Sequence, residues 1–173
     1  MHLRPYEPAP LWGSDDVWRE ANDTVSYLLR RHSNGLKRTV AYARAVREEL
    51  SAVFTCLDNL CLRSCPWCPE PCCLSAKIWF DFKDLLFLHL TASPIPPAPL
   101  LAELTGVCRY FGPKGCLLDR ISRPWICIWY LCPTQLAILR RQGRADIQTI
   151  DRAFLAIKAG RAKMESEFIH LIS

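Results

Sequence analysis

Apolar residues recur at helical spacing near the start of the chain. Behind a proline-containing arm at residues 1–13, Ser14 is suited to cap a helix, because two acidic residues follow it in the first turn. One apolar stripe then continues from Val17 to about Arg31, and Gly35 is placed to end the helix. The pattern predicts a helix that begins after Ser14.

Two longer segments carry apolar residues in alternating steps of four and three, which is the pattern of a heptad seam. The first seam comprises Leu36, Val40, Ala43, Arg47, Leu50, Phe54, Leu57 and Cys61. The second comprises Ile147, Ile150, Phe154, Ile157, Arg161, Met164, Phe168 and Leu171. We expect the two helices to pack antiparallel, or each seam to face a shared core or a second copy of the chain.

One arginine interrupts each seam, Arg47 in the first and Arg161 in the second. A guanidinium inside a seam is costly unless it finds a carboxylate or reaches water. At least one of the two arginines is therefore predicted to be paired or to lie near an anionic centre.

Shorter helices are predicted between the seams. Asp81 can cap a helix over residues 82–90, with Asp84 completing a capping box. A short helix is expected at residues 100–104, and Pro133 suits the first turn of a helix at 133–141. The segment at 108–133 lacks a clean period, and we expect it to form a loop–helix region around metal.

These elements predict a mainly α fold in one small domain over residues 1–173. N-terminal helices occupy 14–61, a cysteine-cluster core occupies 56–133, and C-terminal helices occupy 134–173. The length suits one domain, and 50% hydrophobic with 23% charged residues is an ordinary globular balance.

The chain has ten cysteines, far above ordinary usage. Eight fall in two groups: Cys65, Cys68, Cys72 and Cys73, followed by Cys108, Cys116, Cys127 and Cys132. Closely spaced thiolates are the ligands that zinc and iron–sulfur clusters select, so we predict all eight as metal ligands in cysteine-rich loops. Cys56 and Cys61 are either further ligands or small apolar residues in the helical pattern.

Neither a signal peptide nor a membrane-spanning apolar run is evident in the sequence, which predicts a cytoplasmic, reducing compartment. There, clustered cysteines are expected to bind metal; in an exported chain the ten could instead form five disulfides. The formal charge of +5 counts thiols as neutral, and anionic thiolate centres would offset it. We therefore expect neither nucleic acid nor a membrane as a partner.

The order of the motif elements resembles the YkgJ-like cysteine-cluster family. The matching pattern is Cys65-x2-Cys68-x3-Cys72-Cys73, then Cys108-x7-Cys116-x6-Arg123-Pro124-x2-Cys127-x4-Cys132. That family is described as a zinc- or iron-chelating domain, so the resemblance over residues 56–133 implies metal binding. Flagellin lysine N-methylases look similar in this region, which favours iron–sulfur.

The chain also departs from the family pattern. Residues 69–71 place three residues before the Cys-Cys pair, where the family usually has two. Cys56 and Cys61 are additional to the pattern.

A 4Fe–4S cluster and zinc both suit thiolate ligation. We favour iron–sulfur, because proline and aromatic residues around the cysteines suit a shielded cluster; the aromatic residues are Trp67, Trp79, Phe111, Trp125, Trp129 and Tyr130. Arg123 is predicted to donate hydrogen bonds to the cluster or to offset its charge, and the alternative is a surface arginine before a turn proline.

Three functions follow. The first is an iron–sulfur protein in electron transfer or cluster carriage, with a redox partner. The second is a zinc-stabilised protein-interaction module without catalysis. The third is an iron–sulfur enzyme that modifies a protein substrate; the sequence has no Gly-rich phosphate loop and no G-x-S-x-G motif, and it identifies no catalytic residue.

Overall fold

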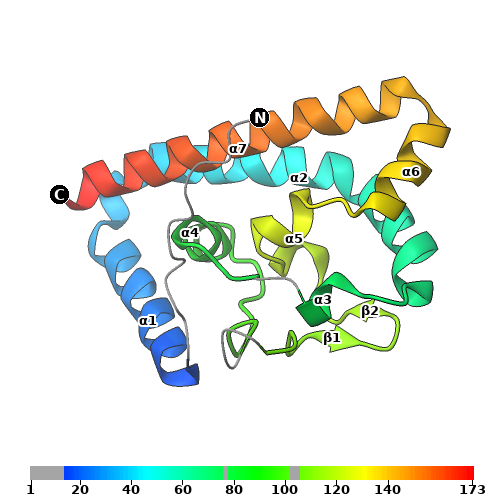
Figure 1. Ribbon diagram of the computed structural model, residues 1–173. Helices are drawn as coiled ribbons and strands as arrows, with labels where there is room; N and C mark the ends of the chain where they lie inside the picture. Colours follow the sequence, from blue (N-terminus) through cyan, green and yellow to red (C-terminus); the bar gives the residue numbers. More distant parts are fainter. Residues whose placement is uncertain (1–13, 76–77, 102–105) are drawn as a thin grey trace, which may run out of the picture.

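The computed structural model describes residues 14–75, 78–101 and 106–173 of the chain, and these are mainly helical (Figure 1). The helices are α1 (Asp15–Arg31), α2 (Lys37–Ser64), α3 (Cys72–Ser75), α4 (Phe82–Leu90), α5 (Trp125–Trp129), α6 (Pro133–Gln142) and α7 (Arg144–Ile172). The strands β1 (Phe111–Gly112) and β2 (Gly115–Cys116) form an antiparallel hairpin. The predicted mainly α class is confirmed.

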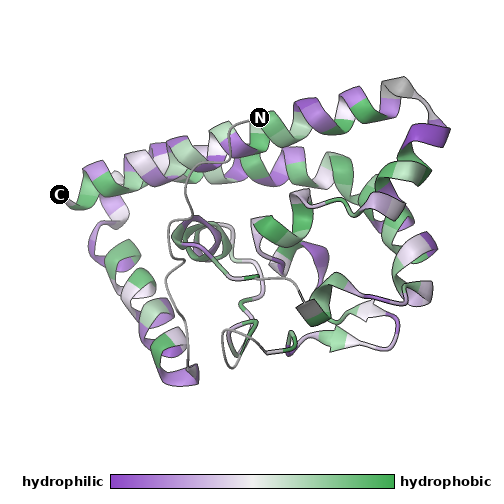
Figure 2. Cartoon of the chain, in the orientation of Figure 1, coloured by the Kyte–Doolittle hydropathy of each residue, from purple (hydrophilic) through white to green (hydrophobic). Residues whose placement is uncertain are grey.

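The long helices α2 and α7 lie side by side and run antiparallel, as the two seams predicted (Figure 1). Arg38 near the start of α2 pairs with Glu167 near the end of α7 at 2.8 Å. Farther along, a Cβ added to Gly160 would lie 2.7 Å from Val46 Cγ2, so the helices approach closely at this glycine. Figure 2 shows the alternation of apolar and polar residues along both helices.

The buried stripe of α2 follows heptad steps in a register that differs from the predicted one. Its members are Thr39, Ala43, Val46, Leu50, Val53, Leu57, Leu60 and Ser64. Of the predicted positions, only Ala43, Leu50 and Leu57 are among them. Arg47 consequently lies outside the seam, exposed, and donates to the Thr91 carbonyl at 2.9 Å. The prediction that Arg47 interrupts the seam was wrong.

The stripe of α7 agrees better with the prediction. Its buried residues include Ile150, Ala153, Ile157, Arg161, Met164 and Phe168. Arg161 is therefore a true seam residue. Glu165, one turn farther along α7, pairs with Lys83 at 2.9 Å.

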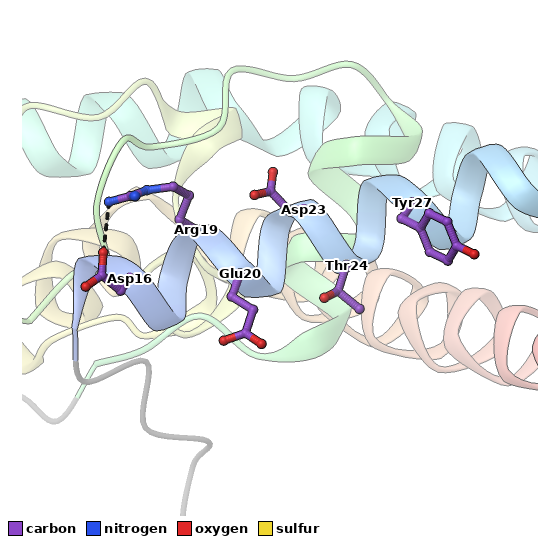
Figure 3. Close-up of a pocket in the computed structure, with 6 residues that line it drawn as sticks. All are labelled: Asp16, Arg19, Glu20, Asp23, Thr24 and Tyr27. Atoms are coloured by element: carbon purple, nitrogen blue, oxygen red, sulfur yellow. Dashed lines mark hydrogen bonds and ion pairs between the residues drawn. The ribbon is translucent and has the colours of Figure 1, made fainter.

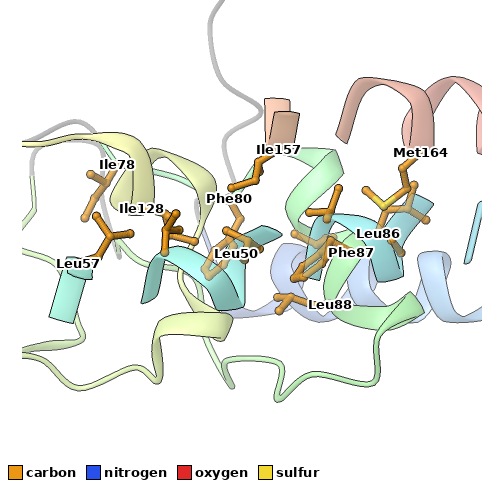
Figure 4. Close-up of a cluster of buried hydrophobic side chains, with 14 of the residues drawn as sticks. Leu50, Leu57, Ile78, Phe80, Leu86, Phe87, Leu88, Ile128, Ile157 and Met164 are labelled. Atoms are coloured by element: carbon orange, nitrogen blue, oxygen red, sulfur yellow. The ribbon is translucent and has the colours of Figure 1, made fainter. Parts of the chain in front are cut away.

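One cluster of buried apolar side chains joins the helices to the cysteine region (Figure 4). Helix α4 contributes about one turn of side chains to this core, since residues 85–88 are all buried between α1, α2 and α7. Ile128 of α5 and Cys108 belong to the same cluster. The cysteine region therefore shares the core of the helical frame.

The N-terminal helix is held by its cap and by one tryptophan. Ser14 accepts a hydrogen bond from the Val17 amide, as predicted. The Trp18 indole donates to the Pro96 carbonyl at 2.9 Å, and its ring lies 4.9 Å from that of Phe80. Helix α1 thus fixes the proline-rich connector to the core.

Arg161 makes a buried ion-pair network that we call the Arg161 clamp, with Asp81 and Asp84 as its other members. The predicted capping box of α4 is present, and each carboxylate also accepts from the guanidinium, at 2.8 Å from Asp81 and 2.7 Å from Asp84. Asp84 further accepts from the Trp125 amide at 2.9 Å. With the Arg161 side chain only 5% exposed, the clamp joins α4, α5 and α7 in the interior.

Two sequence expectations need correction. The helix expected at 100–104 falls partly on residues 102–105, outside the described residues, and Leu100 and Leu101 are not helical. The segment at 108–133 contains a β-hairpin that the lack of periodicity did not predict. Within the described ranges, no helix is long and apolar enough to cross a membrane.

Replacing Arg161 by Ala should destabilise the protein by about 3 to 5 kcal/mol, because it leaves Asp84 buried beside Asp81 without a counter-charge. Arg47→Ala is the matched control. Because Arg47 is exposed, this variant should change the free energy of unfolding by no more than about 1 kcal/mol. Urea unfolding of both variants measures the difference, and equal losses would contradict the clamp.

The clamp also predicts a pH dependence. Burial raises the pKa of Asp84 from 3.8 to about 6 despite the paired Arg161. Between these two pKa values the folded protein keeps a proton that the unfolded chain releases. The free energy of unfolding should therefore fall by up to about 3 kcal/mol as the pH rises from about 4 to 6. Asp84→Asn removes this titration, so unfolding measured from pH 4 to 7 should show a weaker fall in the variant. A fall of the same size in both proteins would contradict the assignment.

Candidate metal centre

The predicted cysteine ligands lie on elements that gather at one end of the molecule. The C-terminal end of α2, helix α3, the β1–β2 hairpin and helix α5 meet there (Figure 1). All ten cysteines are free thiols, which are Cys56, Cys61, Cys65, Cys68, Cys72, Cys73, Cys108, Cys116, Cys127 and Cys132.

Cys61 and Cys65 stand one turn apart at the end of α2. The Cys65 amide donates to the Cys61 carbonyl, so both side chains leave the same side of the helix end. The interaction between the two neighbouring thiols lowers the pKa of Cys61 to about 5 and raises that of Cys65. The two sulfurs therefore act as one neighbouring pair at the end of α2.

Two nitrogen donors from distant segments also converge on the Cys61 sulfur. Arg120 Nη2 lies 3.2 Å and Gln135 Nε2 lies 3.4 Å from Cys61 Sγ. The Arg120 side chain is 6% exposed and pairs with Asp58 on α2 through its Nε. Arg120 thereby attaches the segment before α5 to the end of α2.

Cys72 and Cys73 form the second pair, on the short helix α3. Cys72 is exposed, whereas Cys73 is half-buried and packs against the core. The interaction between the two thiols nevertheless lowers the pKa of Cys72 to about 6 and raises that of Cys73. The two neighbouring cysteines therefore interact although they differ in exposure.

The second cysteine group meets the first at Cys73. The Cys108 amide donates to the Cys73 carbonyl at 3.1 Å, and both Cys108 and Cys127 are close enough to act electrostatically on the Cys73 thiol. Cys116 acts likewise on Cys108 and Cys127. Burial raises the pKa of both Cys108 and Cys127. The structure thus brings the two groups together across 34 intervening residues.

The hairpin lies against the end of α2. Gly115 has a φ of +114°, a conformation that side chains rarely adopt, and a Cβ built there would lie 3.7 Å from Cys65 Cβ. Cys116 follows directly on β2. Glycine at this position lets the chain turn so that the second group returns beside Cys65.

Cys68 and Cys132 have fewer contacts with the other cysteines. The Cys68 amide donates to the Cys65 carbonyl at 3.3 Å. Cys132 caps α6, where its sulfur accepts from the Gln135 amide and its own amide donates to the Gln135 side chain. Since Gln135 also donates to Cys61, one glutamine connects Cys132 to the cluster.

The donor atoms are thiol sulfurs, which soft metals prefer, but they lie in pairs and not around one common point. Within the part of the chain that the structure describes, no three His, Cys, Asp or Glu side chains converge closely enough to hold one ion. The thiols instead lie as two neighbouring pairs, Cys61–Cys65 and Cys72–Cys73. Because metal displaces thiol protons, such pairs are chemically suited to ligation, with side-chain adjustment needed to complete a set of four.

Arg123 and Arg120 have different positions at the cluster. Arg123 Nε donates to the Leu118 carbonyl at 3.0 Å, and its charge also acts on Cys61. Arg120 donates directly to a cysteine sulfur. The sequence analysis proposed Arg123 and did not single out Arg120, because the approach of Arg120 to α2 spans 59 residues of sequence and leaves no local pattern.

Gln135 was also missing from the predicted site, whereas Cys61 had been left open between a further ligand and a small apolar residue. The sequence did contain a signal for Gln135, since Cys132 followed three residues later by glutamine before an apolar run is a capping-box pattern. The aromatic shielding of the cluster was overestimated: Trp67 is 83% exposed, and Trp125 packs on Phe154 with ring centroids 5.5 Å apart.

A hollow of the described surface lies elsewhere, along α1 (Figure 3). It is shallow, and its lining residues all belong to that one helix: Asp16, Arg19, Glu20, Asp23, Thr24 and Tyr27. Asp16 and Arg19 pair with each other at 3.0 Å. This open helix face lacks the enclosure of a substrate site.

Comparison with known proteins gives no relative. No family model, no curated protein and no solved structure matches the chain. The resemblance to the YkgJ-like family therefore rests on the cysteine pattern of residues 56–133 alone.

Arg120→Ala should destabilise the protein by about 2 to 3 kcal/mol, because it removes charge-assisted bonds to Asp58 and Cys61 from a buried position. Arg123→Ala is the control and should cost about 1 kcal/mol, since it loses one bond to a carbonyl. Thermal and urea unfolding of the metal-free variants compare the two, and a larger loss in Arg123→Ala would reverse our assignment.

Proposed function

We propose that this protein is a metal-binding cysteine-cluster protein that holds at least one iron–sulfur cluster through cysteine thiolates. The single observation that carries the proposal is the meeting of the two cysteine groups at Cys73, Cys108 and Cys127. Thiols so close together repel once ionised, and a bound metal centre removes that repulsion.

The ligands proposed are the eight cysteines of the resemblance. They are Cys65, Cys68, Cys72, Cys73, Cys108, Cys116, Cys127 and Cys132. A bound 4Fe–4S cluster would supply one-electron redox chemistry. The chain itself would supply thiolates and nearby cations, with Arg123 beside the cluster as its proposed electrostatic partner.

The position of the cysteines favours exchange with a partner. Cys72 and Trp67 are exposed at the same end of the molecule, next to the half-buried Cys65 and Cys73. A structural zinc site is usually closed by its four ligands, whereas a carrier of electrons or of a cluster needs an accessible edge. We therefore infer a role in electron transfer or cluster carriage with a protein redox partner, in a reducing compartment such as the cytoplasm.

The test is purification without oxygen, followed by measurement of iron, acid-labile sulfide and zinc and by the visible spectrum. We expect iron with matching sulfide and a brown protein. Stoichiometric zinc in a colourless protein without iron would overturn the iron–sulfur proposal and support a zinc-stabilised interaction module.

One serine variant from each group tests whether the site is shared. Cys65→Ser and Cys127→Ser should both lose iron and sulfide if the two groups hold a common centre. Loss in only one variant would show that the groups act separately, and unchanged contents in both would remove these cysteines from the ligand set.

A further inference from the structure

Two cysteines, Cys56 and Cys61, lie on the same helix and outside the motif, and their surroundings differ. Cys56 packs against the core, and burial raises its pKa, with Asp146 adding to the effect. Cys61 contacts Cys65, Arg120 and Gln135 at the end of the helix. We propose that Cys61 is a further thiolate ligand of the metal centre, with Arg120 and Gln135 holding its sulfur; this rests on the proposed function.

The first argument is the direction of the hydrogen bonds. A neutral thiol is a weak acceptor, yet two nitrogen donors from different elements point at the Cys61 sulfur, at 3.2 and 3.4 Å. Both donors belong to buried residues, Arg120 and Gln135. N–H groups aimed at a sulfur are the outer partners that a metal-bound thiolate receives.

The second argument is the spacing. Cys61 and Cys65 are separated by four residues at the end of α2, the separation at which two helix side chains can bind one metal ion. The Cys65 amide donates to the Cys61 carbonyl, so both side chains leave the same side of the helix end. A metal ion bound by both sulfurs would keep them there.

The third argument is the neighbourhood of the pair. Cys72 from α3 is close enough to act electrostatically on both Cys61 and Cys65. Cys72 is thus the neighbouring thiol of the Cys61–Cys65 pair, although the three sulfurs do not converge on one point, and Arg120 supplies a positive charge beside Cys61. Among the described residues no comparable nitrogen donors reach the Cys56 sulfur, so Cys56 serves as the internal control.

The experiment uses Co²⁺ as the probe, because thiolate-to-cobalt charge-transfer absorbance grows with the number of thiolates bound. Metal-free full-length protein, Cys61→Ser and Cys56→Ser are titrated without oxygen. We expect Cys61→Ser to bind Co²⁺ about 10- to 100-fold more weakly and with a smaller charge-transfer absorbance per cobalt. Cys56→Ser should stay within about twofold of the wild type, since it lacks contact with the centre.

Alkylation of the wild-type protein gives a second measurement that needs no variant. With Co²⁺ bound, iodoacetamide should modify Cys61 at least about tenfold more slowly than in the metal-free protein, because a metal-bound thiolate is withheld from attack. Cys56 should show the same modification rate in both samples, which reports that α2 stays folded. Mass spectrometry of the peptides locates each modified cysteine.

The outcomes separate this inference from the proposed function. Full Co²⁺ affinity and absorbance in Cys61→Ser, with equal alkylation of Cys61 in both samples, would overturn the inference and leave the proposed centre in place. Failure of the wild type to bind Co²⁺ would overturn the inference, and the iron and sulfide contents of the purified protein would still decide the proposed function. If Cys61→Ser does not fold, the wild-type alkylation decides the question.

Discussion

The buried guanidinium of Arg161 is the interaction on which the arrangement of the core depends. It neutralises two carboxylates that cap α4, and one of them, Asp84, also receives the first amide of α5. A charge buried this deeply is tolerated only when all of its ion-pair and hydrogen-bond partners are present. The clamp therefore fixes three elements at once: the long helix α7, the buried helix α4 and the short helix that carries Cys127.

The frame determines where the cysteines meet. The close approach of α2 and α7 at Gly160 sets the direction of α2, whose last turn presents Cys61 and Cys65. Arg120 joins that turn to the segment before α5, and the clamp holds α5 in place. Cysteines from distant parts of the sequence are thus positioned by ion pairs and helix packing. This arrangement keeps soft donors close together near an exposed end of the molecule.

Structural features that depend on neighbouring residues could be predicted from the sequence. Features that depend on contacts between distant residues could not. The Ser14 cap, the Asp81–Asp84 capping box and the antiparallel helices follow from local residue types and heptad spacing. The seam of α2 was misplaced by one residue at alternate positions, because apolar residues occupy both neighbouring positions at 53 and 54 and at 60 and 61, so apolar spacing alone does not choose the register. The eight motif cysteines were identified from their spacing, but the contact of Arg120 with Cys61 depends on the folded chain and has no local signal. Metal binding remains a prediction.

The central claim is that both cysteine groups close on a common metal centre. Hydrogen–deuterium exchange of the metal-free and metal-loaded protein tests it directly, because metal binding stabilises the segments that supply ligands. We predict that loading slows exchange in residues 61–73 and in residues 108–132 together, at the same metal equivalents, while the middle of α7 changes little. Slower exchange in only one of the two segments, or in neither, would contradict the account.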